Sequence, residues 1–335
     1  MCFARWPGSN RLFFITGASG FLGGRLAQIL CERGEEVSIL ARPGSDLRHL
    51  ANLKFTTICG DLSDLLLLAD AVRNASFIFH CAACSTDWAP ISTYVSANVT
   101  GTANLLRAAG QAAGLKRFLH ISTTDIYGYP KVPASEDEPF VDAGLPYNQT
   151  KGHGERLVWE AHQQHGLPIT IVRPATIFGP RGKDFTQEVA TMLRLRMMAT
   201  IDGGTAFGGF TYVDNVVVAM LAAASGANCI GRAYNISDGT GASWLDYLRL
   251  FARQLDLPLP WIDLSFATAI KAASVFEFTH RTLRLSGRPP LTRHAVHLLS
   301  RNQEFPTQRA KDDFGFIPVV SFEEGIERSV AWLRR

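Results

Sequence analysis

Short apolar runs alternate with longer amphipathic stretches along the first part of the chain. Runs rich in β-branched and aromatic residues predict buried strands at residues 11–15, 37–40, 55–59, 77–80, 117–122 and 169–172. Apolar residues at helical spacing predict helices at 21–33, 92–113 and 147–165. Apolar strands separated by helices are typical of a parallel sheet that is covered on both faces. We therefore predict an α/β fold built on a doubly wound parallel sheet.

The rhythm changes after residue 173, where glycine, proline and aromatic residues punctuate shorter elements. One more apolar run, at 233–236, predicts a strand that returns to the sheet. We therefore expect a nucleotide-binding domain over residues 1–174, with 211–237 returning to it. Residues 175–335 would then form mainly a smaller, mostly helical substrate lobe.

Composition limits the functions that the chain can have. Of its 335 residues, 47% are hydrophobic, which is ample for a sizeable core. The net charge of +3, without a polybasic run, gives no reason to expect a nucleic-acid partner. No segment reaches the ~20 apolar residues of a membrane span, and residues 1–10 lack the apolar stretch of a signal peptide. We expect a cytoplasmic protein whose partner is a small-molecule substrate.

Six cysteines are scattered along the chain, which is typical of free thiols in a reducing compartment. Cys81 and Cys84 form a C-x-x-C pair, but no second pair lies at zinc-binding spacing. We interpret both side chains as part of a packed wall and expect no metal site.

Glycines at three-residue intervals join the first predicted strand to the first predicted helix. Gly17, Gly20 and Gly23 give the pattern G-x-x-G-x-x-G. A tight turn needs residues without a Cβ, and a bound pyrophosphate needs close approach of the backbone. The following helix supplies unpaired N–H groups and a partial positive charge at its N-terminus. We therefore predict a Rossmann-type dinucleotide site. The same loop adds three residues that we expect to contact the cofactor: Ser19, Phe21 and Leu22.

The end of the second predicted strand bears on the choice of cofactor. An acidic residue there would bind the ribose hydroxyls of NAD, but the chain has Arg42, followed by Ser45. A guanidinium is suited to pair with a ribose 2′-phosphate. The sequence therefore favours NADP over NAD.

Tyr147 and Lys151 lie four residues apart at the start of a predicted helix, so they share one helix face. A nearby ammonium group stabilises a phenolate, and we therefore expect the pKa of Tyr147 to lie well below its ordinary value. Such a tyrosine would exchange a proton with a substrate near neutral pH.

With these motifs in place, the chain resembles the extended short-chain dehydrogenase/reductases of the NAD-dependent epimerase/dehydratase superfamily. The resemblance covers essentially the whole chain. It rests on the glycine loop, on Tyr147 and Lys151, and on four further segments: 60–62 (GDL), 80–83 (HCAA), 98–102 (NVTGT) and 173–180 (RPATIFGP).

The resemblance implies roles for individual residues. Thr123 precedes Tyr127 and Gly128 at the family's T-x-x-x-Y-G spacing, which makes it the hydroxyl of a Tyr/Lys/Thr catalytic triad; Ser122 and Thr124 are the alternatives. Further cofactor contacts are implied for Asp61, Leu62, Ala82, Ala83, Asn98, Pro174 and Ile177, besides Tyr147 and Lys151. A homodimer is implied by the resemblance alone.

The implied reaction moves a hydride between nicotinamide and a carbonyl carbon. In the reducing direction, Thr123 and Tyr147 bind the carbonyl oxygen and Tyr147 supplies the proton. Lys151 binds the nicotinamide ribose and keeps the tyrosine acidic. Alcohol oxidation runs the same steps backwards.

Several departures weaken the resemblance to the sugar-nucleotide epimerases and dehydratases of the family. Ala175 stands where those enzymes usually have asparagine, and 208–210 (GGF) lacks the arginine of their R-D-F segment. Only Asp125 remains of the dehydratases' acidic pair. Segments 210–215, 231–238 and 288–292 look more like the 3β-hydroxysteroid dehydrogenase and ketoreductase branch, which acts on hydrophobic alcohols and ketones.

We therefore predict an NAD(P)-dependent oxidoreductase that interconverts a hydrophobic secondary alcohol and a ketone. A sugar-nucleotide epimerase or dehydratase with tightly bound NAD is the alternative, and a non-catalytic dinucleotide-binding subunit is a third. Aromatic residues are candidates for an apolar pocket, although core packing is the better interpretation of each singly: Trp88, Tyr94, Phe178, Phe207, Trp261, Phe266 and Phe276. We interpret 261–285 as a lid or as plain packing in preference to a membrane-surface helix, and we assign no role to a histidine.

Overall fold

The structure is a computed structural model that describes residues 11–335. Residues 1–10, on which the signal-peptide prediction falls, lie outside the described part. The strands are β1 (Leu12–Thr16), β2 (Glu36–Ala41), β3 (Thr56–Cys59), β4 (Phe77–His80), β5 (Arg117–Ile121), β6 (Ile169–Pro174), β7 (Thr176–Phe178), β8 (Ala199–Ile201), β9 (Phe210–Tyr212), β10 (Arg232–Ile236) and β11 (Ile262–Leu264).

The α-helices are α1 (Phe21–Glu32), α2 (Leu65–Val72), α3 (Ile91–Tyr94), α4 (Gly101–Ala109), α5 (Pro146–His165), α6 (Val189–Arg194), α7 (Val213–Ser225), α8 (Trp244–Gln254), α9 (Phe266–Thr282), α10 (Arg293–Ser300), α11 (Gln308–Phe314) and α12 (Phe322–Leu333). Two π-helices, η2 (Val95–Thr100) and η4 (Lys183–Glu188), and four 3₁₀ turns, η1 (Arg48–Leu50), η3 (Thr124–Tyr127), η5 (Asp202–Gly204) and η6 (Ala227–Cys229), complete the described elements.

A parallel sheet of seven strands forms the centre of the described chain, in the order β3-β2-β1-β4-β5-β6-β10. The order reverses direction at β1, which is the doubly wound arrangement predicted from the alternation of strands and helices. β10 pairs with β6 along its whole length, from Arg232 opposite Thr170 to Ile236 opposite Pro174. The α/β prediction is therefore confirmed.

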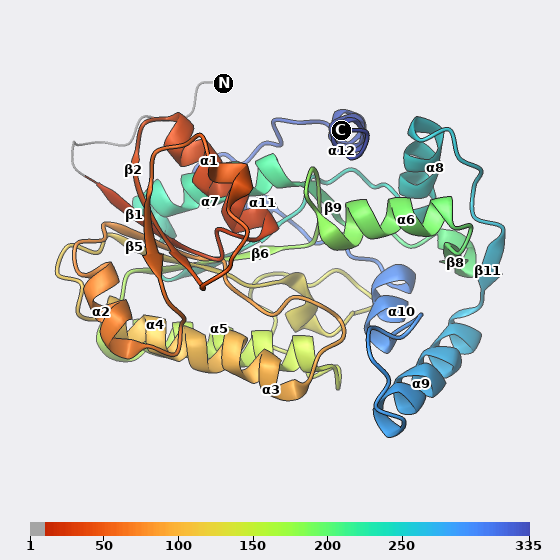
Figure 1. Ribbon diagram of the computed structural model, residues 1–335, viewed down its shortest axis with the longest axis horizontal. Helices are drawn as coiled ribbons and strands as arrows, with labels where there is room; N and C mark the ends of the chain where they lie inside the picture. The colour runs from red at the N-terminus through yellow and green to blue at the C-terminus, as the bar shows by residue number, and fades with distance from the viewer. Residues whose placement is uncertain (1–10) are drawn as a thin grey trace.

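Helices cover both faces of the sheet (Figure 1). On one face, Leu26 and Leu30 of α1 pack with Val216 and Met220 of α7 in a fully buried cluster. On the other face, the buried cluster joins α2, α4 and α5 to the strands. Strands buried on both faces need apolar side chains at successive positions, which explains why the strand segments read as continuous apolar runs.

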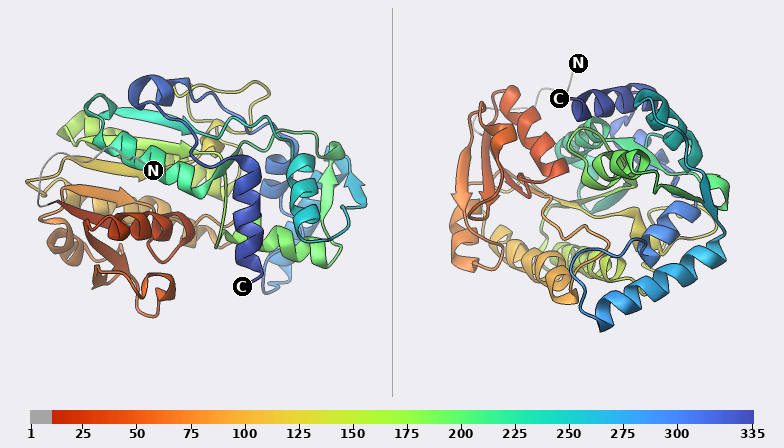
Figure 2. Two further views of the ribbon diagram at one scale, coloured as in Figure 1. Left: turned by 90° about the horizontal axis from the view of Figure 1, so that it is seen from above. Right: turned by 45° about the vertical axis from the view of Figure 1, so that its right-hand side comes forward.

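Helices α6, α8, α9 and α10, which follow β6 in the chain, lie together at one end of the molecule, opposite the end that holds β1 and β2 (Figures 1 and 2). Their core is aromatic: the Phe178 ring meets those of Phe210, Tyr212, Tyr247 and Phe322 edge-on, with centroids 5.6–6.2 Å apart. This C-terminal region is mainly helical, as predicted. No helix of residues 11–335 has both the length and the apolar character that a membrane crossing requires.

The predicted helix at 92–113 differs in detail from the observed one. It is divided into α3, the π-helix η2 and α4. The wider turn brings the carbonyl of Asn98 against α5, where a Cβ on Gly154 would collide with it. Such π-turns fit one extra residue into a helix and often occur near functional sites.

Candidate active site

A cavity of about 1350 Å³ opens where the parallel strands end. Its lining includes residues that follow the carboxyl ends of β1 to β6, together with residues of η4, α6, β8, β11, α9 and α10. Ligands of open α/β sheets bind outside the carboxyl ends of the strands, at the point where the strand order reverses. The cavity therefore lies where the fold predicts a cofactor, with the C-terminal lobe as its other wall.

Almost every predicted cofactor residue lines this cavity: Gly17, Ser19, Gly20, Phe21, Leu22, Gly23, Arg42, Asp61, Leu62, Ala82, Ala83, Tyr147, Lys151, Pro174 and Ile177. Asn98 is the exception, because it lies buried behind the wall. Its side-chain amide donates to the Cys84 carbonyl at 3.2 Å and to Thr150 Oγ1 at 3.1 Å, and its oxygen accepts from the Cys84 N–H at 2.8 Å. Asn98 thus shapes the wall of the cavity from behind.

The glycine loop has the close packing that its sequence predicts. Gly17 has a φ of +75°, and a Cβ there would lie 2.7 Å from the backbone nitrogen of Ala82. A Cβ on Gly23 would lie 2.5 Å from the Gly17 carbonyl oxygen. Gly20 precedes α1 and offers no side chain to cap it, so the first N–H groups of the helix stay free for an anionic group. The loop fits a dinucleotide pyrophosphate.

The basic end of the cavity is formed by Arg42, which is exposed and follows β2, with Ser45 beside it. Asp46 is the first acidic side chain after β2. Its carboxylate is bound by Arg48 at 2.7 Å, and Asp46 is not among the lining residues. The position that would bind ribose hydroxyls through a carboxylate therefore presents a guanidinium.

The three residues of the predicted triad meet in the same cavity. Thr123 follows β5, and its hydroxyl accepts the backbone N–H of Asp125 at 3.1 Å, which caps η3. Tyr147 and Lys151 lie on successive turns of α5. Lys151 Nζ donates to the Ile121 carbonyl at 2.5 Å. Burial lowers the pKa of Lys151 to about 8, against the opposing charge of Glu155.

The expected low pKa of Tyr147 is wrong for this structure. Burial raises the pKa above its ordinary value, the negative charge of Asp125 raises it further, and the hydroxyl of Thr123 lowers it only in part. The sequence argument assumed that the Lys151 ammonium acts mainly on the phenol, but that ammonium donates to a carbonyl of β5. Asp125, which follows Thr123 by two residues, was left out of that argument.

A buried ion pair between β6 and α5 supports the helix that carries Tyr147 and Lys151. Arg173, at the end of β6, donates to both oxygens of Glu155 at 2.5 and 3.2 Å, and each side chain is only 5% exposed. Arg173 also donates to the Tyr127 hydroxyl at 2.7 Å and to the Glu136 carbonyl at 3.0 Å. Because Glu155 lies one turn after Lys151, this pair fixes α5 against the sheet. Sequence reasoning noted Arg173 only as part of a motif and missed Glu155.

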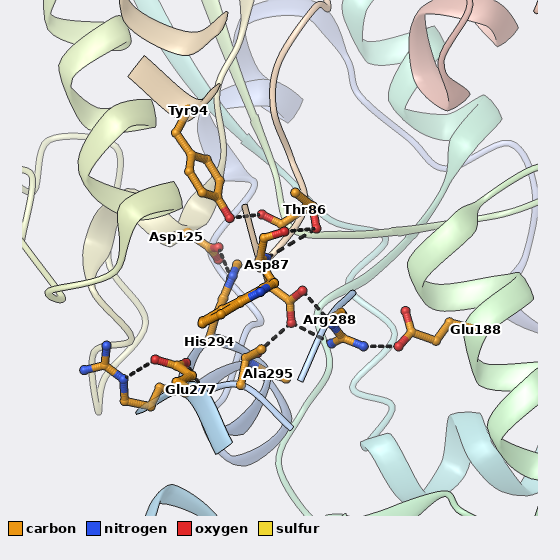
Figure 3. A network of polar contacts seen from close by, with 12 residues as sticks. Thr86, Asp87, Tyr94, Asp125, Glu188, Glu277, Arg288, His294 and Ala295 are labelled. Atoms are coloured by element: carbon orange, nitrogen blue, oxygen red, sulfur yellow. Dashed lines mark hydrogen bonds and ion pairs between the residues drawn. The ribbon is translucent and has the colours of Figure 1, made fainter. Parts of the chain in front are cut away.

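The lobe contributes a polar network that sequence reasoning also missed (Figure 3). Arg288 lies between Asp87, which accepts at 2.6 and 2.7 Å, and Glu188. Beside it, the imidazole of His294 faces the carboxylate of Asp125. No local signal marks His294, because its partner is 169 positions away in the sequence.

The apolar part of the cavity wall draws little on the seven aromatic candidates, for each of which core packing was the better interpretation. Of the seven aromatic candidates, Phe276 alone is among the lining residues. Tyr94 and Phe178 are fully buried in packing, and Trp261 is 72% exposed. Beside other apolar residues such as Phe185, Ile201, Trp244 and Ile262, methionine and leucine contribute seven side chains to the lobe side of the wall: Met192, Met197, Met198, Leu264, Leu291, Leu298 and Leu299.

A parallel sheet that ends in a pyrophosphate loop, beside a tyrosine and a lysine on one helix, defines a dinucleotide-dependent oxidoreductase of the Rossmann class. The chain belongs to the NAD dependent epimerase/dehydratase family, whose model matches residues 13–237. It is an NAD-dependent oxidoreductase that acts on CH–OH groups.

Individual relatives point to two kinds of substrate. The chain is 32% identical to 2-alkyl-3-oxoalkanoate reductase of Stenotrophomonas maltophilia, over 94% of this chain and 97% of that one. It is 29% identical to 3-beta-hydroxysteroid dehydrogenase of Mycolicibacterium neoaurum, over 93% and 88%. A crystal structure of UDP-glucuronic acid 4-epimerase from Bacillus cereus with NAD has a TM-score of 0.76 at 25% identity and covers 96% of this chain and 98% of that one.

Proposed function

We propose that the protein interconverts a hydrophobic secondary alcohol and its ketone with NADP(H), and that Tyr147, Lys151 and Thr123 form its catalytic triad. The observation that carries the proposal is the wall of methionine and leucine side chains in the same cavity as Tyr147. Flexible apolar side chains suit an alkyl chain or a steroid ring system, because they bury apolar surface without demanding hydrogen bonds. The names of the reductase and dehydrogenase relatives agree with this substrate class.

The lobe offers few unengaged cations to the diphosphate of a sugar nucleotide. Lys183 and Arg288 are its basic residues that line the cavity, and Asp87 and Glu188 both bind Arg288. At Gly208, where the arginine of an R-D-F segment would stand, a Cβ would lie 2.2 Å from the ring of Phe210, so a side chain there would require that ring to move. A diphosphate beside Arg288 would meet the carboxylates of Asp87 and Glu188 as well as a neutralised guanidinium, which disfavours binding.

Asp125 is also poorly suited to the acid role of a dehydratase. Its carboxylate is 7% exposed and lies 2.9 Å from His294 Nε2. His294 thus occupies the carboxylate that would have to contact a sugar hydroxyl.

The residues of the chain divide the work of the proposed reaction. A nicotinamide cofactor bound in the cavity would supply the hydride. Thr123 and Tyr147 orient the carbonyl oxygen, and Tyr147 donates the proton that the new alkoxide requires. We expect Lys151 to bind ribose hydroxyls and the apolar wall to limit the access of water to the reacting carbon.

The choice of NADP rests on Arg42, because the 2′-phosphate of NADP is the group that a guanidinium binds best at this position. Arg42→Ala should raise the KM for NADPH by about tenfold or more and change that for NADH little. Arg48→Ala is the matched control, since Arg48 is a nearby cation that pairs with Asp46. Equal effects of the two variants, or of Arg42→Ala on both cofactors, would refute the assignment.

The test of function follows reduced-nicotinamide absorbance with purified protein, NADPH or NADH, and a panel of hydrophobic ketones. The panel includes 3-keto steroids and long-chain β-keto acids, and UDP- and TDP-sugars run beside it. Substrate-dependent loss of absorbance that disappears in Tyr147→Phe supports the ketoreductase. Sugar products without net cofactor oxidation would replace it with the epimerase or dehydratase.

A further inference from the structure

His294 is the residue by which the lobe reaches the predicted catalytic tyrosine. It lies in the first turn of α10, and its side chain is 11% exposed. Its Nε2 is 2.9 Å from a carboxylate oxygen of Asp125, which belongs to the η3 turn that Thr123 caps. Figure 3 shows the imidazole with one nitrogen directed at that carboxylate. One contact therefore joins α10 to the turn that holds the predicted hydroxyl of the triad.

The same imidazole also stacks on Tyr147. The two ring centroids are 5.5 Å apart and the planes differ by 22°. Thr292, which caps α10, donates its hydroxyl to Asp87 at 2.6 Å, and Arg288 binds the same carboxylate. These contacts hold the start of α10 against the segment that carries Asp87 and so fix His294 beside the phenol.

The charged groups around His294 favour its protonated form and define the charge that this form would neutralise. Burial lowers the pKa of His294, but the hydrogen bond and charge of Asp125, with Asp87 beyond it, outweigh burial and raise the pKa above its ordinary value. The groups that face it from the elements packed around it are Asp125, Asp87, Asp184, Arg288, His297, Tyr129 and Tyr147. The carboxylate of Asp125 acts on Tyr147 as well, and it opposes the formation of phenolate.

We propose that His294 is a positioning residue for Tyr147, whose imidazolium neutralises Asp125 beside the reacting phenol and holds the phenol ring from the lobe side. It transfers no proton. When Tyr147 gives its proton to the substrate oxygen, negative charge appears on the phenol, and Asp125 would repel it if the imidazolium were absent. The effect belongs to the transition state, so it should change kcat and leave KM nearly unchanged.

The inference rests on the proposed role of Tyr147, and its test compares two phenylalanine variants of α10. His294→Phe keeps a stacked ring and removes the cation; we expect kcat to fall about tenfold to a hundredfold, with KM within about threefold. His297→Phe is the matched control, because His297 lies on the same helix and stacks on Tyr129 at 5.3 Å. Its kcat should stay within about twofold.

A rescue distinguishes charge neutralisation from packing. In Asp125→Asn/His294→Phe there is no carboxylate to neutralise, and most of the lost kcat should return. A double variant no faster than His294→Phe, or a loss that falls wholly on KM, would overturn the proposal. Thermal melting accompanies each variant. His294→Phe could unfold because it leaves the carboxylate of Asp125 buried without a partner. The double variant, which lacks that carboxylate, then carries the test. A kcat near that of the wild type supports the proposal, and a kcat as low as a hundredth of it overturns the proposal.

The assay uses whichever substrate the wild type turns over, ketone or sugar nucleotide. Failure of the ketoreductase proposal therefore leaves this comparison intact, since both reactions would use Tyr147.

Discussion

Replacing Arg173 by methionine should destabilise the protein far more than an ordinary substitution. The change leaves Glu155 as a buried carboxylate without its partner and removes the donor that Tyr127 and Glu136 share. Both side chains of the ion pair are 5% exposed, so solvent cannot take over the lost contacts. Methionine has a similar length, which limits the cavity that forms.

The expected loss of stability follows from the cost of removing one partner of a buried ion pair, which is about 3–5 kcal/mol. We expect a loss of about 4 kcal/mol in the free energy of unfolding, which lowers the melting temperature by roughly 8 °C for a chain of this size. Burial raises the pKa of Glu155, but the charge and hydrogen bond of Arg173 outweigh burial and lower it. A carboxyl with a lowered pKa contributes stability above its unfolded pKa and loses that contribution as pH falls, so the deficit of Arg173→Met should shrink in acid.

The assay is urea unfolding of the wild type, Arg173→Met and Arg173→Met/Glu155→Leu, followed by circular dichroism. The double variant removes the stranded carboxylate and should recover about 2 kcal/mol or more of the loss. A single variant that loses less than about 1 kcal/mol, or a double variant less stable than the single, would refute the reasoning.

Three further outcomes follow from the same contacts. Gly23→Ala should weaken NADPH binding by about tenfold or more, because the added Cβ would press on the Gly17 carbonyl. Fluorescence titration measures the affinity, with Gly114→Ala as the control because Gly114 has open space around it. Equal affinities of the two variants would contradict the prediction. Because the pKa of Lys151 is about 8, kcat/KM should decline as pH rises through that value and the ammonium is lost; a flat alkaline profile would disprove the need for the cation. His294 has a raised pKa, so its pair with Asp125 should stabilise the fold fully below the ordinary histidine pKa of about 6.5 and lose this effect as pH rises through the raised value. Melting of the wild type against Asp125→Asn across this range measures it, and parallel pH curves would exclude the pair as the source.

The sequence was most informative where function depends on adjacent residues. The glycine loop and the pair at Tyr147 and Lys151 are local patterns, and the strands are apolar because both faces of the sheet are covered. The seven strands could therefore be placed within a residue or two from periodicity alone. Two-sided burial leaves a signal in composition that survives without any knowledge of tertiary contacts.

What the sequence could not supply depends on contacts between distant segments. The pairing of Asp125 with His294, and of Glu155 with Arg173, leaves no periodic trace. The pKa of Tyr147 went in the unexpected direction because the nearest charges come from tertiary structure and not from the helix alone. Aromatic residues were candidates for the apolar wall, although core packing was the better interpretation of each. The wall contains one of the seven, Phe276, together with methionine, leucine and other apolar side chains.

The return of β10 to the sheet limits how this protein can be cut and recombined. β10 protects the outer edge of β6, whose Ile169, Ile171 and Val172 are fully buried. A fragment that stops after residue 174 would expose the edge of this β-branched strand with unpaired backbone groups. Such an edge can pair with another chain and cause aggregation. Exchanging lobes between relatives to alter substrate preference should therefore keep 232–236 with the recipient sheet and join the foreign segment on both sides of it.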